Sequence, residues 1–107
     1  MPGHDLEAQL RLEADERVRL AAETERALVV VTDRRLIVKE AERYALDLPI
    51  EDIRRIELSV ERGRPATLMV VPRSSQHDPQ VLSVSRDQLE AVSRMVHIVG
   101  DRLALLD

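Results

Sequence analysis

The chain of 107 residues contains no cysteine, tryptophan or phenylalanine, and its one aromatic residue is Tyr44. Without cysteine, disulfide bonds, thiolate zinc sites and cysteine nucleophiles are all excluded, which fits an intracellular, cytoplasmic location. With one aromatic side chain, stacking on bases, sugars or ligand rings is nearly excluded as a way of binding. The core of the protein must therefore be aliphatic.

Charge of one sign is not concentrated anywhere in the chain. The 16 basic and 20 acidic residues give a net charge of −4. Residues 1–50 carry 8 basic against 11 acidic side chains, and residues 51–107 carry 8 against 9. Nucleic-acid-binding proteins show a clustered positive surface, so we expect no nucleic-acid partner.

Long hydrophobic runs are missing too. The longest, Ala27 to Val31, is far shorter than the roughly 20 residues that cross a bilayer. The charged N-terminus has no hydrophobic signal-peptide region. With 44% hydrophobic residues, the chain fits one soluble domain with a modest core. We expect this domain over residues 15–107, after an N-terminal extension over residues 1–14.

Residues for catalysis, metal binding or cofactor binding do not form a recognisable pattern. The three histidines, His4, His77 and His97, are far apart and share no ligand spacing. Ser74 and Ser75 lie beside His77 and Asp78, but four neighbours in one polar loop seldom supply triad geometry. The three glycines form no phosphate-binding motif. We therefore expect a protein that is not an enzyme and has no cofactor and no metal.

Most of the chain has the two-residue hydrophobic period of half-buried strands. A short helix over Asp5 to Ala14, with Asp5 as its N-cap, is predicted to precede them. The sequence predicts seven strands, over residues 17–22, 27–32, 35–39, 44–48, 55–61, 67–71 and 80–84. Tyr44, Leu46 and Leu48 are expected on one face of the fourth strand.

The charges inside the apolar stretch Val29 to Val38 mark the tip of a hairpin. Asp33 and Arg34 fall between two β-branched runs, and aspartate favours turns by binding nearby backbone N–H groups. Arg34 and Arg35 are therefore interpreted as solvated turn residues.

The last 22 residues change to a helical period. Ser85 and Gln88 have the spacing of a capping box, and Val84 and Leu89 that of a hydrophobic staple. A helix is predicted from Arg86 to about Leu105.

Two apolar stripes on this helix cover roughly 200° of its circumference, more than one core requires. The first contains Leu89, Val92, Val96, Val99, Leu103 and Leu106, and the second contains Ala91, Met95, Ile98 and Leu105. We expect Met95, Ile98 and Leu105 to bind a protein partner, including a second copy of the chain. The alternative is that the strands are broad enough to cover both stripes.

Two motifs resemble the bacterial pleckstrin-homology-like family. One is Val-Thr-Asp-Arg-Arg-Leu-Ile at residues 31–37, and the other is Leu-Pro-Ile-Glu-Asp-Ile at residues 48–53. Members of that family similarly place a T-[DN]-x-R-L turn early and an L-P-L-x-D-I segment before the next strand. The resemblance covers about residues 15–106 and implies a mainly β fold, a barrel of about seven antiparallel strands capped by a C-terminal helix.

The same resemblance implies an interaction or assembly module that forms homo-oligomers. It implies lipid binding less strongly, because the loop where eukaryotic relatives collect basic residues is here Glu23-Thr24-Glu25. The tryptophan typical of the eukaryotic helix is also missing.

The runner-up function is binding of an anionic lipid or phosphate ligand at a membrane surface. Arg54, Arg55, Arg62 and Arg64 flank one predicted strand, and guanidinium groups suit phosphate. Acidic residues are interleaved with them, so a solvated face of ion pairs is the competing interpretation. The net negative charge of the chain also disfavours a membrane partner.

Overall fold

Two antiparallel sheets and one long helix make up the computed structural model, which describes residue 10 and residues 12–106. The mainly β fold with a C-terminal helix, predicted from periodicity, is confirmed. The strands are β1 (Val18–Glu23), β2 (Leu28–Thr32), β3 (Arg35–Glu40), β4 (Arg43–Pro49), β5 (Ile53–Ser59), β6 (Ala66–Pro72) and β7 (Gln80–Val84). Two 3-10 turns, η1 (Ile50–Asp52) and η2 (Arg86–Gln88), precede β5 and the helix α2 (Leu89–Leu106).

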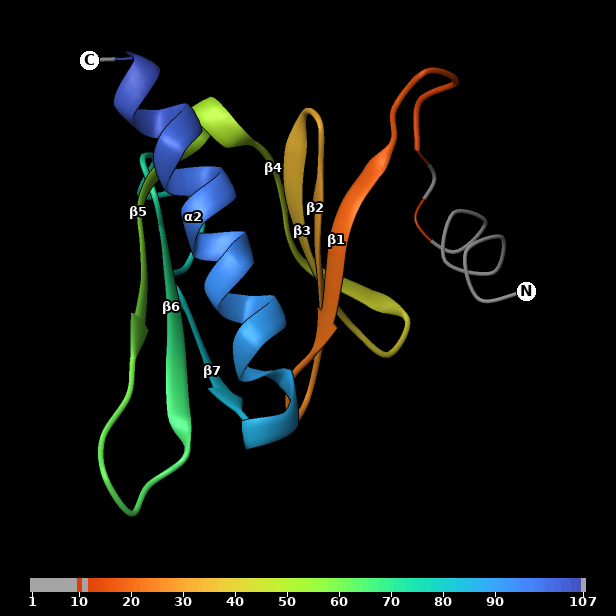
Figure 1. Ribbon diagram of the computed structural model, residues 1–107. Helices are drawn as coiled ribbons and strands as arrows, with labels where there is room; N and C mark the ends of the chain where they lie inside the picture. Colours follow the sequence, from red (N-terminus) through yellow and green to blue (C-terminus); the bar gives the residue numbers. More distant parts are fainter. Residues whose placement is uncertain (1–9, 11, 107) are drawn as a thin grey trace.

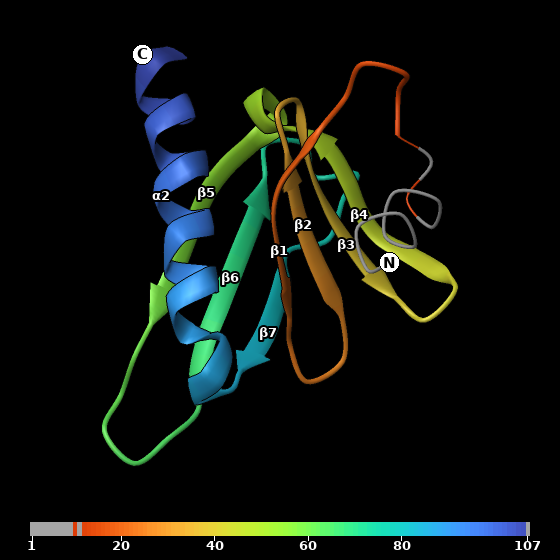
Figure 2. The same cartoon turned by 45° about the vertical axis from the view of Figure 1, so that its right-hand side comes forward.

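The strands follow one another as simple antiparallel neighbours. Sheet A has the order β1-β2-β3-β4 and sheet B the order β5-β6-β7, with η1 joining them. The helix α2 packs against β5, η1 and β1, so it closes one side of the space between the sheets (Figure 1). A second view shows the same two layers, with α2 beside β5 (Figure 2).

The main core lies between the two sheets and α2. It is aliphatic, as the absence of large aromatics requires, and every strand contributes inward side chains. Its buried members include Val29, Val31, Leu36, Val38, Leu46, Leu48, Ile53, Leu68, Val70, Leu82, Val92, Met95 and Val99.

Sheet A is also buried on its outer face, which is unusual for an antiparallel sheet. Val30 and Ile37 alternate with the inward residues of β2 and β3, yet neither is exposed. They form a separate cluster with Leu10, against which Leu12 and Tyr44 are partly buried. The central strands of sheet A therefore have apolar residues on both faces.

A β-bulge corrects one prediction about β4. Val38 pairs with Leu46, but Lys39 pairs with Tyr44, so Ala45 is an extra residue. Ala45 packs on the main core, whereas Tyr44 packs on the outer cluster. The expectation that Tyr44 shares a face with Leu46 is wrong, because the bulge reverses the alternation.

The two predicted helices also need correction at their ends. Most of the predicted segment Asp5 to Ala14 lies outside the described residues. Leu10 is helical, whereas Leu12 and Glu13 are irregular and Ala14 is in a turn. At the other helix, residues 86–88 form the 3-10 turn η2, and the α-helix begins at Leu89.

The predicted capping box is not formed. Ser85 precedes η2 but makes no cap hydrogen bond with its side chain, and its hydroxyl binds Asp87 at 2.5 Å. The Gln88 side chain instead accepts a hydrogen bond from the backbone N–H of Glu23, at 3.0 Å. This glutamine therefore ties the start of the helix to β1.

Candidate functional site

The hairpin tip between β2 and β3 holds a network of charged side chains. Glu16 precedes β1, and its side chain is completely buried. Its carboxylate accepts two hydrogen bonds from the Arg35 guanidinium, at 2.8 and 2.9 Å, and one from the Thr32 hydroxyl, at 2.5 Å. Arg35 also binds both carboxylate oxygens of Asp47, at 2.9 and 3.0 Å.

This geometry corrects the interpretation of Arg35 as a solvated turn residue. The Arg35 side chain is only 20% exposed, and it links β3 to Glu16, which precedes β1, and to Asp47 on β4. Arg34, by contrast, is exposed and makes an ion pair of 2.6 Å with exposed Asp15. The prediction of a solvated residue is confirmed for Arg34 alone.

Hydrogen bonding keeps the Glu16–Arg35 pair ionised. Burial alone would raise the pKa of Glu16, but hydrogen bonds from Arg35 and Thr32 outweigh it and lower that pKa to about 2. The hydrogen bonds to Glu16 raise the pKa of Arg35 above its ordinary value, against the effect of burial. Among the described residues, no buried side-chain N or O atom lacks a partner. The network is therefore satisfied internally and is better suited to fixing the chain than to holding a ligand.

The three helix residues predicted to bind a partner have different environments. Met95 is fully buried in the main core, Ile98 is partly buried against it, and Leu105 is 83% exposed. An interface role for Met95 is corrected: it fills the space between the sheets, so the strands cover both stripes at this point. Leu106, assigned to the first stripe, is 55% exposed.

The four arginines of the runner-up prediction lie near the two ends of β5. Arg54 and Arg55 are at its start, while Arg62 and Arg64 lie in the turn after it. A strand of this length spans roughly 20 Å, so the four do not form one site. Arg55 pairs with Glu57 at 3.3 Å and Arg64 with Glu61 at 3.7 Å, as in an ordinary solvated face.

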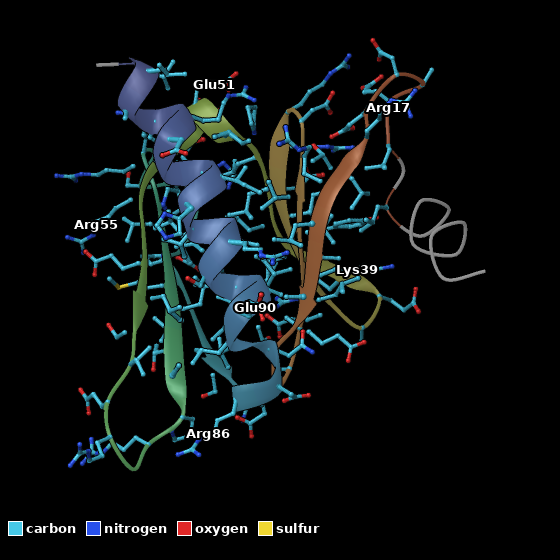
Figure 3. The ribbon with its side chains drawn as sticks, in the orientation of Figure 1. Arg17, Lys39, Glu51, Arg55, Arg86 and Glu90 are labelled. Atoms are coloured by element: carbon cyan, nitrogen blue, oxygen red, sulfur yellow. The ribbon has the colours of Figure 1, made fainter. Side chains whose placement is uncertain are left out.

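Arg62 and Arg64 instead share a cleft with Arg86, which the sequence reasoning did not single out. The cleft has a volume of about 640 Å³, and its walls are the β5–β6 turn and the chain entering η2. Apolar surface comes from Val60 and Leu89. Figure 3 shows Arg86 near the end of β6 that leads from this turn, whereas Arg55 projects from the upper part of β5.

No short-range signal in the sequence links Arg86 to the other two arginines. It follows them by more than twenty residues, and β6 and β7 lie between. Among the described residues, neither Arg62 nor Arg86 forms an ion pair or a side-chain hydrogen bond.

The polar loop between β6 and β7 is held by its own turns. The Ser74 hydroxyl accepts a hydrogen bond from the Gln76 N–H, and the Ser74 carbonyl accepts one from the His77 N–H. In the described part of the chain, no group of three or more His, Cys, Asp or Glu side chains is placed to hold a metal ion. Nor is any helix in that part long and apolar enough to cross a membrane.

Two solved structures resemble this fold over most of its length. One is a pleckstrin homology domain from Shewanella amazonensis SB2B, with 23% identity and a TM-score of 0.67, covering 90% of this chain and 86% of that one. The other is a DUF1696 family protein with a pleckstrin-homology domain from Shewanella loihica PV-4, with 22% identity and the same TM-score. It matches 90% of this chain and 94% of its own. No family model and no curated protein matches the sequence.

Proposed function

Because the chain has the fold of a pleckstrin-homology domain, we propose that it is a non-enzymatic binding module that associates with protein, including a second copy of itself. The contact surface in this proposal is the last turn of α2, residues 103–106, which we call the α2 tip. The cytoplasm is the compartment that the absence of cysteine favours.

The exposure of the α2 tip is the observation that carries the proposal. Leu105 and Leu106 are 83% and 55% exposed. Covering aliphatic side chains of this size with a partner lowers the free energy, because apolar surface is removed from water. A shallow hollow of about 210 Å³ lies beside Leu105 and is lined in part by Ile98 and Thr32. In Figure 1 this turn extends past the beginning of β5.

Light scattering over a concentration series, at moderate and high salt, tests this proposal. We expect an oligomer that survives high salt, because apolar contacts are not screened by ions. Leu105→Glu together with Leu106→Glu is expected to give a folded monomer. The matched control is Val81→Glu, since Val81 is 65% exposed on β7 and carries no part of the proposed contact. A wild-type monomer at every concentration would contradict the proposal.

The cleft beside the β5–β6 turn favours a second candidate function, binding of an anionic group. Arg62, Arg64 and Arg86 line it, and planar guanidinium groups suit phosphate oxygens. The apolar side chains in its wall suit the carbon chain of an amphiphile. This residue set replaces the one predicted from the sequence by dropping Arg54 and Arg55 and adding Arg86.

Vesicle binding separates this candidate from nonspecific attraction. We expect binding to phosphatidylglycerol vesicles, weakened by salt and by the triple change Arg62→Gln, Arg64→Gln and Arg86→Gln. Arg54→Gln with Arg55→Gln alters charge near the other end of β5 and is expected to leave binding unchanged. An equal loss of vesicle binding in the triple variant and in the Arg54→Gln, Arg55→Gln variant would rule out a site in the cleft.

A further inference from the structure

The outer face of sheet A is an apolar surface that the chain covers with its own N-terminal segment. Val30 and Ile37 lie on that face and have no exposed surface. Leu10, itself 1% exposed, completes their cluster, and Leu12 packs at its margin. Figures 1 and 2 show residues 12–17, in red-orange, on the side of β1 that faces away from sheet B.

This cover is separate from the main core. Neither Leu10 nor Leu12 belongs to the cluster between the sheets and α2, and neither packs against it. Loss of the Leu10 and Leu12 contacts would therefore leave the main core buried and would expose only the outer cluster. An antiparallel sheet normally exposes one face to water. Because the outer face of sheet A is apolar, it is stable only when another segment of protein covers it.

A turn with few supports connects the cover to β1. Glu13, Ala14 and Asp15 are all exposed. The turn is closed by two short-range hydrogen bonds, from the Glu13 N–H to the Glu16 carboxylate and from the Glu16 N–H to the Glu13 carbonyl. The ion pair of Asp15 with Arg34 also holds it, but both side chains are exposed and such pairs contribute little. Straightening this turn would swing Leu10 away from its own sheet.

The chain directly after the turn is firmly anchored. Glu16 is held by Arg35 and Thr32. The Arg17 N–H donates to the Asp33 carboxylate at 3.1 Å, and the Asp33 N–H donates to the Arg17 carbonyl at 3.0 Å. The exposed turn over residues 13–15 therefore lies directly before the anchored residues Glu16 and Arg17. Breaking the turn would release Leu10 and Leu12 from the outer cluster without disturbing β1.

We propose that the outer face of sheet A is an interface between two copies of the chain, in which the segment containing Leu10 and Leu12 of one copy packs on Val30 and Ile37 of the other. The occupant is identified by the structure itself, because this is the sequence already seated on that face. Exchange of identical segments makes the same contacts between chains as within one, so protein concentration decides the balance. The contact does not involve the α2 tip, so either proposal can fail alone.

Single-cysteine variants test the exchange, since the native chain has no cysteine to give a background. Leu12→Cys and Tyr44→Cys each place one thiol at the margin of the outer cluster. The two proteins, mixed and treated with a short bismaleimide, are expected to form a crosslink between positions 12 and 44 that must join two chains. The crosslinked fraction should rise with concentration. The double variant, Leu12→Cys with Tyr44→Cys, is the reactivity control, because it also crosslinks within one chain.

Two further substitutions in the full chain decide between the interfaces. Leu10→Asp is expected to lower the crosslinked fraction at least about tenfold, because it removes the buried leucine. Leu105→Glu is expected to leave it unchanged. The exchange is overturned if the mixed variants give no crosslink while the double variant reacts. It is also overturned if Leu105→Glu abolishes the crosslink while Leu10→Asp does not, an outcome that would support the α2 tip instead.

Discussion

The Glu16 side chain remains charged inside the protein because four hydrogen bonds compensate for its lost hydration. Arg35 donates two of them through its planar fork, the Thr32 hydroxyl donates the third and the Glu13 N–H the fourth. Removing Glu16 leaves the largely buried Arg35 with only the more exposed Asp47 as an ionic partner, which is more damaging than losing an exposed pair.

We therefore expect Glu16→Gln to lower the free energy of unfolding at pH 7 by about 3 kcal/mol. The pKa of Glu16 is about 2 in the folded protein, against an ordinary value of 4.5. A lowered pKa stabilises the folded state fully above pH 4.5, and this contribution is lost as the pH falls from 4.5 towards 2. Urea unfolding of both proteins across this range measures the difference.

The control is Glu57→Gln, which removes the half-exposed pair with Arg55. Exposed pairs contribute little, so we expect a change below about 0.5 kcal/mol. Similar losses in the two variants, or an unchanged pH dependence in Glu16→Gln, would show that the buried network does not stabilise the fold as argued.

Two turn residues have positive φ angles, and substitutions at them should have opposite effects. Gly63 has a φ of 79°, and a Cβ atom there would meet nothing within 4 Å, so Gly63→Ala tests backbone strain alone. We expect a loss of about 1 kcal/mol. Ala41 has a φ of 53°, and Ala41→Gly should stabilise the protein by up to about 1 kcal/mol. Thermal unfolding measures both, and shifts of the same sign would contradict this account.

At the scale of elements, α2 shows how a stripe of apolar residues is divided between core and surface. Met95 and Leu105 belong to the same predicted stripe, but only Met95 lies between the sheets. The helix extends beyond the strands that cover it (Figure 1), so residues of equal hydrophobicity have different neighbours.

We expect Met95→Ala to destabilise the folded chain by roughly 2–5 kcal/mol, the cost of a cavity in a packed core. Leu105→Ala should change the stability of the monomer by less than about 0.5 kcal/mol. Denaturant unfolding at low protein concentration separates these effects from association. A small loss for Met95→Ala would show that the core around Met95 is less tightly packed than its burial indicates.

At the scale of the whole molecule, the described residues form two apolar clusters with sheet A between them. The main core joins both sheets and α2, while the outer cluster joins only sheet A and the N-terminal segment. Segments with few buried contacts open more readily than the core. The molecule should therefore open in at least two steps.

Native-state hydrogen exchange measures these steps. We expect the amides of residues 12–15 to exchange through local opening, and those of β6 only through global unfolding. Leu10→Ala should increase exchange over residues 12–15 while leaving β6 nearly unchanged. An equal increase in β6 would mean that the segment belongs to the same cooperative unit as the core.

The alternation of apolar residues was enough to predict seven strands, because period two places side chains on opposite faces whatever the strand pairs with. It failed at Tyr44, where a bulge inserts Ala45 and reverses the faces. The capping-box prediction also failed because of a contact with another element: the Gln88 side chain accepts a hydrogen bond from Glu23 on β1 instead of capping its own turn.

The amino-acid sequence by itself determined the aliphatic core, the absence of thiol chemistry and the order of strands and helix, since all three depend on composition or local periodicity. Only the tertiary structure decided that Arg35 is drawn into a buried network, that Met95 is core, that Arg86 joins Arg62 and Arg64, and that Leu10 covers sheet A. Each of these depends on contacts between residues distant in the chain. Such contacts are fixed by how the sheets and helix pack, and local periodicity carries no information about them.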